Sequence, residues 1–264
     1  MMPNLRETIK KVLPLSHPAM IGAIRRVRNL RRLPEKLSPR YRRQLLQEFE
    51  GCHDFAGLFA FARDRLSGGA LQNFEEIRDA IDYIRPHQPR SFCEIGTANG
   101  GTNFLITRSL PSLKTIIALD LFITNRWVLR LLASPGQQQY FFNGLSQDRL
   151  TFERVERALQ GAPLDLLFID GDHSFEGVSG DFRLYSPLVK EGGLIMFHDI
   201  VPDHATRFGT GGINRAGDVP VLWQMLKPHF SHREFIRDPE QDGLGLGILH
   251  WSKNIQLPEL MPTR

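Results

Sequence analysis

SFCEIGTANGG, residues 91–101, joins a short apolar run to a turn that is rich in glycine. We predict a buried strand over residues 91–96 and a helix over residues 101–110. Gly96 permits a sharp turn where the strand ends, and the later glycines let the backbone approach a ligand closely before the helix begins. The stretch therefore predicts the first strand–loop–helix unit of an α/β domain.

The chain beyond this unit alternates between apolar strands and helices. Further strands are predicted at residues 115–121, 140–143, 164–170, 193–199, 233–237 and 244–251, with helices at 147–160, 175–189 and 219–226. Near-continuous apolar strands separated by helices are typical of a parallel sheet that is covered on both faces. We therefore expect a Rossmann-like, doubly wound α/β domain over residues 71–264, with a mostly parallel seven-stranded sheet.

Residues 1–70 are predicted to be a basic helical extension of this domain. Helices are expected at 20–33, 41–50 and 55–66, and another at 71–85 opens the α/β domain. Residues 1–50 hold 12 Lys or Arg against 4 Asp or Glu, a net charge of +8. Such an arm is compatible with a solvated helix or a subunit contact, and also with peripheral contact to an anionic membrane surface or a glycolipid. Nucleic acid is disfavoured, because no aromatic residues are interleaved there to stack on bases.

Composition places the chain among globular proteins of the cytoplasm. The 41% hydrophobic content of its 264 residues is sufficient for a large core. No run of 18 apolar residues is present, and the N-terminus has no signal-peptide pattern. Two cysteines, Cys52 and Cys93, do not form a disulfide framework. We expect a cytoplasmic protein, with the inner face of the membrane as a further location if the basic arm binds it.

Asp120 stands at the end of the second predicted strand. Ligands of doubly wound sheets bind beyond the carboxyl ends of the strands, and a carboxylate at this place can accept both hydroxyls of a ribose. An acidic loop or cap residue is the simpler explanation. The dinucleotide signature would require glycine at position 98, where this chain has Ala98, which disfavours an NAD-linked oxidoreductase.

FIDGDHS, residues 168–174, places several polar groups directly after a buried strand. Asp170 and Asp199, at the ends of neighbouring strands, are expected to face each other and to hold a divalent cation. His173 would then remove a proton from a substrate hydroxyl. Asp172 and Ser174 are expected only to cap the following helix, and a satisfied core histidine is the simpler explanation of His198.

Three segments together resemble a known family: EIGTANGG (94–101), ALDLF (118–122) and LDLLFIDGDHSFEGVSGDFRLYSPLVKEGGLIMFHDI (164–200). They resemble class I methyltransferases of the group that contains macrocin-type sugar O-methyltransferases and cephalosporin-hydroxylase-like proteins. The resemblance implies S-adenosylmethionine as cofactor, Mg²⁺ as probable metal, and His173 with Asp170 as catalytic residues. The cofactor contacts it implies are Glu94, Gly96, Thr97, Gly100, Asp120, Ser146 and Asp170.

The implied metal ligands are Asp170, His198 and Asp199, and here the chain departs from the family. The family has an acidic pair after its fifth strand, whereas this chain has His198 in the first position of the pair. A histidine can ligate a transition metal. It can also leave a weaker Mg²⁺ site, or none.

The function that we expect is metal-assisted O-methylation of a hydroxyl on a sugar, glycolipid or natural product, with a small molecule or glycan as acceptor. The alternatives are an NAD-linked oxidoreductase and a non-catalytic glycan- or membrane-associated protein with the same fold. A homo-oligomer is expected. Residues 208–217 hold four glycines and are predicted to be a mobile lid, with Arg207 or Arg215 available to an anionic acceptor.

Overall fold

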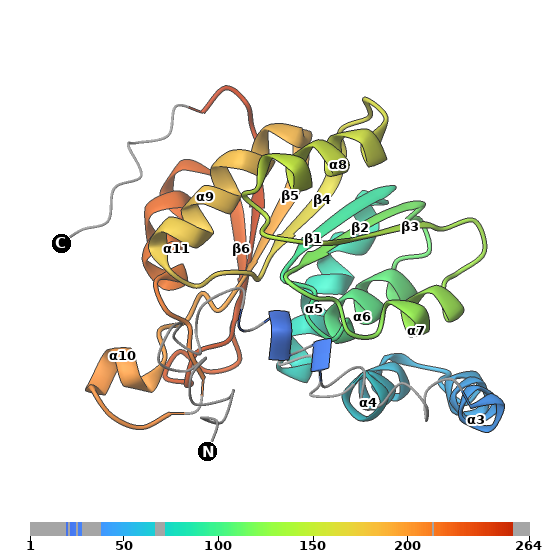
Figure 1. Cartoon of the computed structure of the whole chain (residues 1–264). Helices are drawn as coiled ribbons and strands as arrows, with labels where there is room; N and C mark the ends of the chain where they lie inside the picture. The colour runs from blue at the N-terminus through green and yellow to red at the C-terminus, as the bar shows by residue number, and fades with distance from the viewer. Residues whose placement is uncertain are drawn as a thin grey trace, which may run out of the picture.

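The computed structural model describes residues 38–66, 72–212 and 214–255, together with positions 20, 22–24, 26 and 27. The described residues form a seven-stranded sheet with the order β3-β2-β1-β4-β5-β7-β6 (Figure 1). The strands are β1 (Ser91–Ile95), β2 (Thr115–Asp120), β3 (Gln138–Asn143), β4 (Leu164–Ile169), β5 (Val189–His198), β6 (His232–Phe235) and β7 (Leu246–His250). The first five strands are parallel, and β7 pairs antiparallel with both β5 and β6. The predicted mostly parallel Rossmann-like sheet is confirmed.

Helices cover both faces of this sheet because alternate side chains of each strand enter different cores. Phe92 of β1 joins one buried cluster, and its neighbour Cys93 joins the other. The first cluster packs against α3 (Pro39–Glu50), α4 (Phe55–Arg65), α5 (Phe74–Ile84), α6 (Gly101–Ser109) and α7 (Arg126–Leu131). The second packs against α8 (Arg149–Leu159), α9 (Phe175–Tyr185) and α11 (Val219–Leu226). The carboxyl ends of the parallel strands remain free for a site.

Two short helices were not predicted, α7 and α10 (His204–Phe208). Six and five residues are too few to show a helical repeat of apolar positions. The predicted helix over residues 175–189 ends earlier, at Tyr185, because Pro187 lies in a 3-10 turn over Ser186–Leu188. The strand predicted at 193–199 is longer and begins at Val189.

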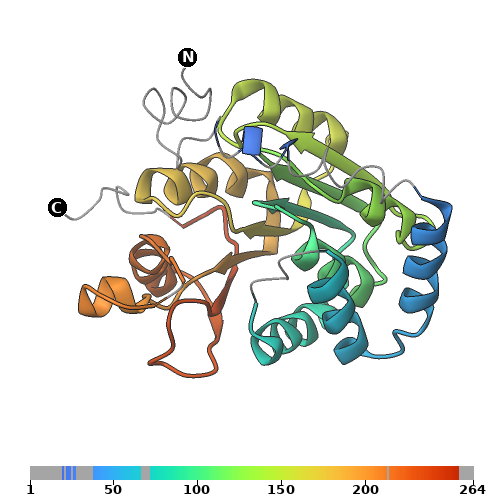
Figure 2. The same ribbon diagram turned by 60° about the horizontal axis from the view of Figure 1, so that its bottom comes forward.

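The described part of the N-terminal region packs on the α/β domain. Leu45 of α3 and Phe61 of α4 belong to the same buried cluster as Phe104 of α6. Figure 2 shows the blue and cyan helices of residues 39–84 gathered on one side of the molecule. Most of the predicted helix 20–33 lies outside the described residues. None of the described helices is long and apolar enough to cross a membrane.

Candidate active site

The candidate site is built where β1, β2, β4 and β5 end. Ile95, the last residue of β1, pairs with Ile169 of β4, which in turn pairs with Phe197 of β5. The loops that follow these strands therefore begin side by side. They contain the glycine-rich turn, Asp170 and the His198–Asp199 pair.

Gly96 allows two of these loops to touch. Its φ is +95°, and a Cβ at this position would lie 1.7 Å from the carbonyl oxygen of Asp170. Only glycine is compatible with so close an approach of two backbones. Gly100 begins α6 with φ +86°, and Ala98 between them takes φ +47° without being glycine. The sharp turn predicted at Gly96 is present and also touches the β4 loop, whereas a close approach of the later glycines to a ligand stays a prediction.

Asp120 connects the end of β2 to the glycine-rich turn. Its Oδ2 accepts a hydrogen bond from the Ala98 amide at 2.8 Å, and its Oδ1 accepts one from the Phe122 amide at 2.9 Å. The two amides fix the Asp120 carboxylate at the carboxyl end of β2. A carboxylate held against a left-handed glycine turn fits the adenosine part of a nucleoside cofactor.

Glu94 lies beneath the same turn and is 1% exposed. It accepts a hydrogen bond from Asn103 Nδ2 at 2.9 Å. Burial raises the pKa of Glu94 to about 8, although hydrogen bonds from Thr97 and Asn103 oppose the rise. Asn103 Oδ1, fully buried, has no hydrogen-bond partner among the described residues. The floor of the turn therefore contains polar groups that the described protein atoms do not fully satisfy.

Ser146, a predicted cofactor contact, is held in place by α9. Its hydroxyl donates to Asp181 Oδ1 at 2.6 Å, and the Tyr185 hydroxyl donates to the Ser146 carbonyl at 2.5 Å. Gln147 Nε2 donates to the Gly177 carbonyl at 2.9 Å. Burial raises the pKa of Asp181 to about 6. Since the Ser146 hydrogen is used by Asp181, its oxygen can offer a ligand only lone pairs.

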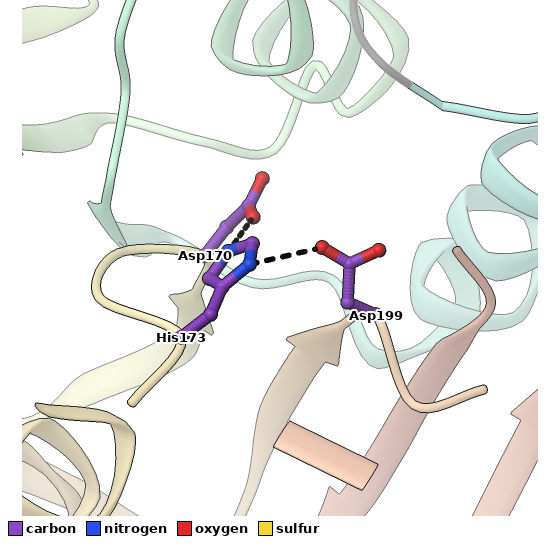
Figure 3. A group of neighbouring side chains, drawn as sticks. All are labelled: Asp170, His173 and Asp199. Carbon is purple, nitrogen blue, oxygen red and sulfur yellow. Dashed lines mark ion pairs between the residues drawn. The ribbon is translucent and has the colours of Figure 1, made fainter. Parts of the chain in front are cut away.

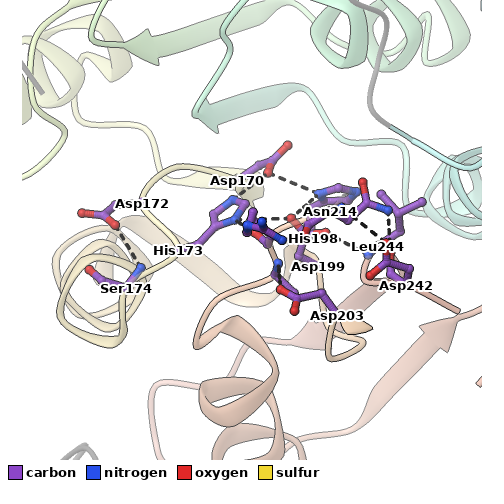
Figure 4. A network of polar contacts seen from close by, with 12 residues as sticks. Asp170, Asp172, His173, Ser174, His198, Asp199, Asp203, Asn214, Asp242 and Leu244 are labelled. Atoms are coloured by element: carbon purple, nitrogen blue, oxygen red, sulfur yellow. Dashed lines mark hydrogen bonds and ion pairs between the residues drawn. The ribbon is translucent and has the colours of Figure 1, made fainter. Parts of the chain in front are cut away.

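Asp170, His173, His198 and Asp199 meet at the ends of β4 and β5 (Figures 3 and 4). His173 Nε2 lies 3.6 Å from Asp170 Oδ1, and its Nδ1 lies 3.5 Å from Asp199 Oδ2. His198 Nδ1 lies 3.3 Å from Asp170 Oδ1 and 3.2 Å from Asp199 Oδ2. Both histidines therefore contact both carboxylates. Asp170, His173 and Asp199 each offer a ligand atom within 4.8 Å of the others, as a metal ion would require.

The charges of this group are strongly coupled. Burial would raise the pKa of Asp170, but the charge of His198 and hydrogen bonds from both histidines outweigh it and lower the pKa to about 2. Burial would lower the pKa of His173, but Asp170, the Arg215 carbonyl and Asp199 raise it to about 9. Burial also opposes charge on His198, yet the two carboxylates raise its pKa well above the ordinary value. The protonation of each histidine therefore depends on the carboxylates beside it.

The tautomer of His173 follows from its neighbours. Nδ1 lies 2.6 Å from the Arg215 carbonyl oxygen. A carbonyl accepts and never donates, so Nδ1 carries a hydrogen and the lone pair of a neutral ring is on Nε2. Ser174 has the expected capping role, because its Oγ accepts from Gly177 N at the start of α9. Asp172 Oδ1 accepts from Ser174 N, the amide of the capping residue itself, and so does not cap the helix directly.

A cavity of about 550 Å³ adjoins His173. It is lined by Asp172, His173, Ser174, Asp203, Ala205, Thr206, Arg215, Gly217 and Asp218. The His173 imidazole is the only ring among them, and most of the others carry a charge or a hydroxyl. The cavity therefore places several groups that can form hydrogen bonds beside His173.

The loop over residues 208–217 is anchored at its C-terminal end. Asp203 Oδ2 accepts from the Ala216 amide, and Asn214 Nδ2 donates to the Asp242 carbonyl. Gly209 and Gly211 have open space around their Cα atoms among the described residues. Motion is therefore expected only in the tip before Asn214. The anchoring residues Asp203 and Asp242 were not predicted, because no local sequence pattern shows which distant amides they accept from.

Arg207 and Arg215, the two predicted contacts to an anionic acceptor, differ in their surroundings. Arg207 binds Glu240 Oε2 and the Pro239 carbonyl, whereas Arg215 lines the cavity and donates from Nη1 to the Asn214 carbonyl. Of the two, Arg215 is the one that lies beside His173.

A family model of known proteins matches the part of the chain that holds this site. Residues 93–200, which contain every strand end described above, match a model described as a methyltransferase domain. The match covers less than half of the 264 residues.

The solved structures share the fold at low sequence identity. An O-methyltransferase from Bacillus cereus, in complex with SAH, has a TM-score of 0.54 at 16% identity and covers 75% of this chain and 90% of its own. The O-methyltransferase TomG from Streptomyces achromogenes, involved in tomaymycin synthesis and in complex with SAM, has a TM-score of 0.52 at 14% identity, with coverage of 75% and 89%. This chain therefore shares its fold with these two O-methyltransferases.

Two curated relatives match only over part of their length. Uncharacterized protein R132 from Acanthamoeba polyphaga mimivirus is 30% identical over 115 residues, which are 41% of this chain and 51% of that protein. Uncharacterized protein y4gI from Sinorhizobium fredii is 25% identical over 181 residues, 64% of this chain and 18% of that protein. The chain thus spans about half of one relative and less than a fifth of the other.

Proposed function

We propose that the chain is an S-adenosylmethionine-dependent O-methyltransferase, assisted by a divalent cation, that acts on a hydroxyl of a sugar, glycolipid or natural product. The observation that carries the proposal is the meeting of Asp170, His173 and Asp199 beside the glycine-rich turn of a methyltransferase domain. A nucleoside site and a carboxylate–histidine group then share one edge of the sheet, as methyl transfer to an oxygen requires.

The nucleoside would be held by the first two loops. Asp120 would accept the ribose hydroxyls, the backbone near Gly96 would approach the methionine part, and Ser146 would offer lone pairs to the base. S-adenosylmethionine supplies an electrophilic methyl group when bound. The protein has then to hold an oxygen nucleophile in line with it and to keep water away.

His173 is the base in this proposal. Its Nδ1–H is fixed by the Arg215 carbonyl, so Nε2 would take the proton of the acceptor hydroxyl. Asp170 Oδ1, at 3.6 Å from Nε2, would stabilise the imidazolium that forms. The ring is 30% exposed and lines the 550 Å³ cavity, so an acceptor in that cavity can reach it.

The carboxylates of Asp170 and Asp199 fit a divalent cation by charge and by distance. Such an ion, when bound, would lower the pKa of a coordinated hydroxyl and orient the acceptor. The Asp199 carboxylate is oriented by a hydrogen bond that Leu244 N donates to Oδ1 at 2.9 Å, so Oδ2 faces the histidines. The support for the narrower likeness to macrocin-type sugar methyltransferases is the sequence of residues 164–200.

Binding and transfer can be tested separately. Calorimetry should detect S-adenosylmethionine binding to the purified chain, and NAD should not bind. Transfer of a labelled methyl group should then be sought to nucleotide sugars, glycolipids and polyols, with His173→Ala as the inactive variant and the exposed Asp148→Asn as the matched control. Binding of NAD in place of S-adenosylmethionine would support the oxidoreductase, and binding of neither would support the non-catalytic alternative.

The proposed location is the cytoplasm, with peripheral contact to the inner membrane face. The support is the exposure of Arg26, Arg40, Arg42 and Arg43, whereas Arg25, Arg28, Arg31 and Arg32 lie outside the described residues. Sedimentation with anionic vesicles, but not with neutral ones, would test the contact. We also propose a homo-oligomer, for which light scattering gives the mass.

A further inference from the structure

We propose that the cation site of this chain is a mixed nitrogen–oxygen site that selects a later first-row transition metal such as Co²⁺ or Zn²⁺ over Mg²⁺. The inference rests on the proposed function only for its location. It is carried by the contact of His198 and His173 with the same two carboxylates, those of Asp170 and Asp199. Any ion bound between these carboxylates has at least one imidazole nitrogen beside it.

The spacing of the donors fits a tetrahedral ion better than an octahedral one. His198 Nδ1 lies 3.3 Å from Asp170 Oδ1 and 3.2 Å from Asp199 Oδ2. Metal–ligand bonds of about 2.0–2.2 Å give tetrahedral edges of about 3.3–3.6 Å. Octahedral Mg²⁺, with bonds of about 2.0–2.1 Å, requires adjacent ligands only about 2.8–3.0 Å apart. The two separations are therefore closer to the tetrahedral edges that Zn²⁺ and Co²⁺ accept than to the octahedral edges of Mg²⁺.

Donor chemistry points the same way. Mg²⁺ prefers oxygen ligands and keeps several of its waters, whereas imidazole favours the later divalent ions of the first row. His198 and Asp199 are 4% and 7% exposed, so half of the donor set has little access to water. A hydrated ion would have to lose most of its shell on that side of the site.

His198 has no route to leave the site. It is the last residue of β5, and its Cα pairs with that of Leu246 in β7. Its Nδ1 faces the two carboxylates, and its buried Nε2 has no hydrogen-bond partner among the described residues. Asp199, which follows, takes φ +60°, and its Oδ1 is fixed by the Leu244 amide. The position of His198 Nδ1 is therefore fixed by the strand pairing of its own residue.

The two histidines differ in exposure, and this difference assigns them different roles. His173 is 30% exposed and lines the acceptor cavity, so it remains the base. His198 is 4% exposed and is not among the residues that line that cavity, so it is the permanent metal ligand. The site thus comprises Asp170, His198 and Asp199, with His173 at its open side.

The test uses full-length protein that has been freed of metal by chelation and dialysis. Mg²⁺, Mn²⁺, Co²⁺ and Zn²⁺ are titrated separately in a calorimeter, and Co²⁺ is also followed by its visible absorption. We expect Co²⁺ and Zn²⁺ each to bind at least tenfold more tightly than Mg²⁺, and Co²⁺ to give the intense band of a tetrahedral site. Equal or tighter binding of Mg²⁺, or binding of no ion, would overturn the inference.

Variants locate the effect. His198→Asp creates an all-oxygen site, so Mg²⁺ binding should strengthen and the Co²⁺ band should weaken. Asp199→Asn should remove the Co²⁺ band, and His232→Asn, on the exposed edge strand β6, should leave it unchanged. A band that survives Asp199→Asn would show that Co²⁺ binds elsewhere and would refute the site. If His198→Asp does not fold, the wild-type titrations still decide.

S-adenosylmethionine binding is measured on the same samples. If the cofactor binds and no metal preference is found, the metal inference fails and the proposed methyltransferase stands. If a transition metal is selected and the cofactor does not bind, the proposed function fails and the metal site stands.

Discussion

Replacing Gly96 with alanine tests whether the contact between the β1 and β4 loops organises the site. The new Cβ would lie 1.7 Å from the Asp170 carbonyl oxygen, 2.4 Å from its carbon and 2.9 Å from the Gly171 Cα, and the φ of +95° disfavours any side chain. The positive φ costs about 1–2 kcal/mol. Forcing the two backbones apart costs about 1–3 kcal/mol more. The expected loss of folding free energy is therefore about 2–5 kcal/mol, with loss of S-adenosylmethionine binding.

Gly161→Ala is the matched control. Gly161 also has a positive φ, +81°, but no described atom lies within 4 Å of its added Cβ. Gly161→Ala should lose only the folding free energy that the positive φ costs, about 1–2 kcal/mol. Alanine also restricts the unfolded chain, and this stabilising effect is the same in both variants. Urea denaturation followed by circular dichroism gives both values. Equal losses in the two variants would refute the argument from close approach.

Three further predictions concern single groups. Asp120→Ala should weaken S-adenosylmethionine binding about tenfold or more, since a charge-assisted contact contributes about 1.5–3 kcal/mol; Asp148→Asn should not, and calorimetry compares them. The pKa of Glu94 is raised from 4.5 to about 8, so the native state keeps the proton to higher pH, and the free energy of unfolding falls as pH rises between these values. Urea titrations should therefore show Glu94→Gln gaining stability over the wild type across this pH range. A difference between the two proteins that does not change with pH would contradict the shift. Chymotrypsin should cut after Phe208, which is 65% exposed, and S-adenosylhomocysteine with the acceptor should slow the cut; equal rates would leave the lid unsupported.

Much of the fold could be predicted from the sequence because its signals are local. An apolar run followed by glycines, as at residues 91–101, defines a strand and a turn without any distant partner. The same holds for the polar groups after β4 and β5, since parallel strands bring their carboxyl ends to one edge of the sheet. Their mutual contacts in the structure agree with that expectation.

What could not be predicted depends on contacts between distant segments. Glycine is required at position 96 because the Asp170 carbonyl lies against it. The Ser146 hydroxyl is held by Asp181, 35 residues away. Asp181 has the appearance of an ordinary helix residue in the sequence, yet it is fully buried. The two short helices α7 and α10 are held by packing and capping rather than by a repeat of their own.

Asp203 and Asp242 fix the chain on either side of Arg215, next to His173. The two carboxylates belong to different connections, and they hold the chain at Ala216 and Asn214. The Arg215 carbonyl, which orients His173, lies between these two anchored residues. A side chain at Gly212 would collide with the Asp242 carboxylate, whereas Gly209 and Gly211 have open space around them. Substitutions at positions 209 and 211 are therefore expected to leave the orientation of His173 unchanged, and a substitution at position 212 would disturb it.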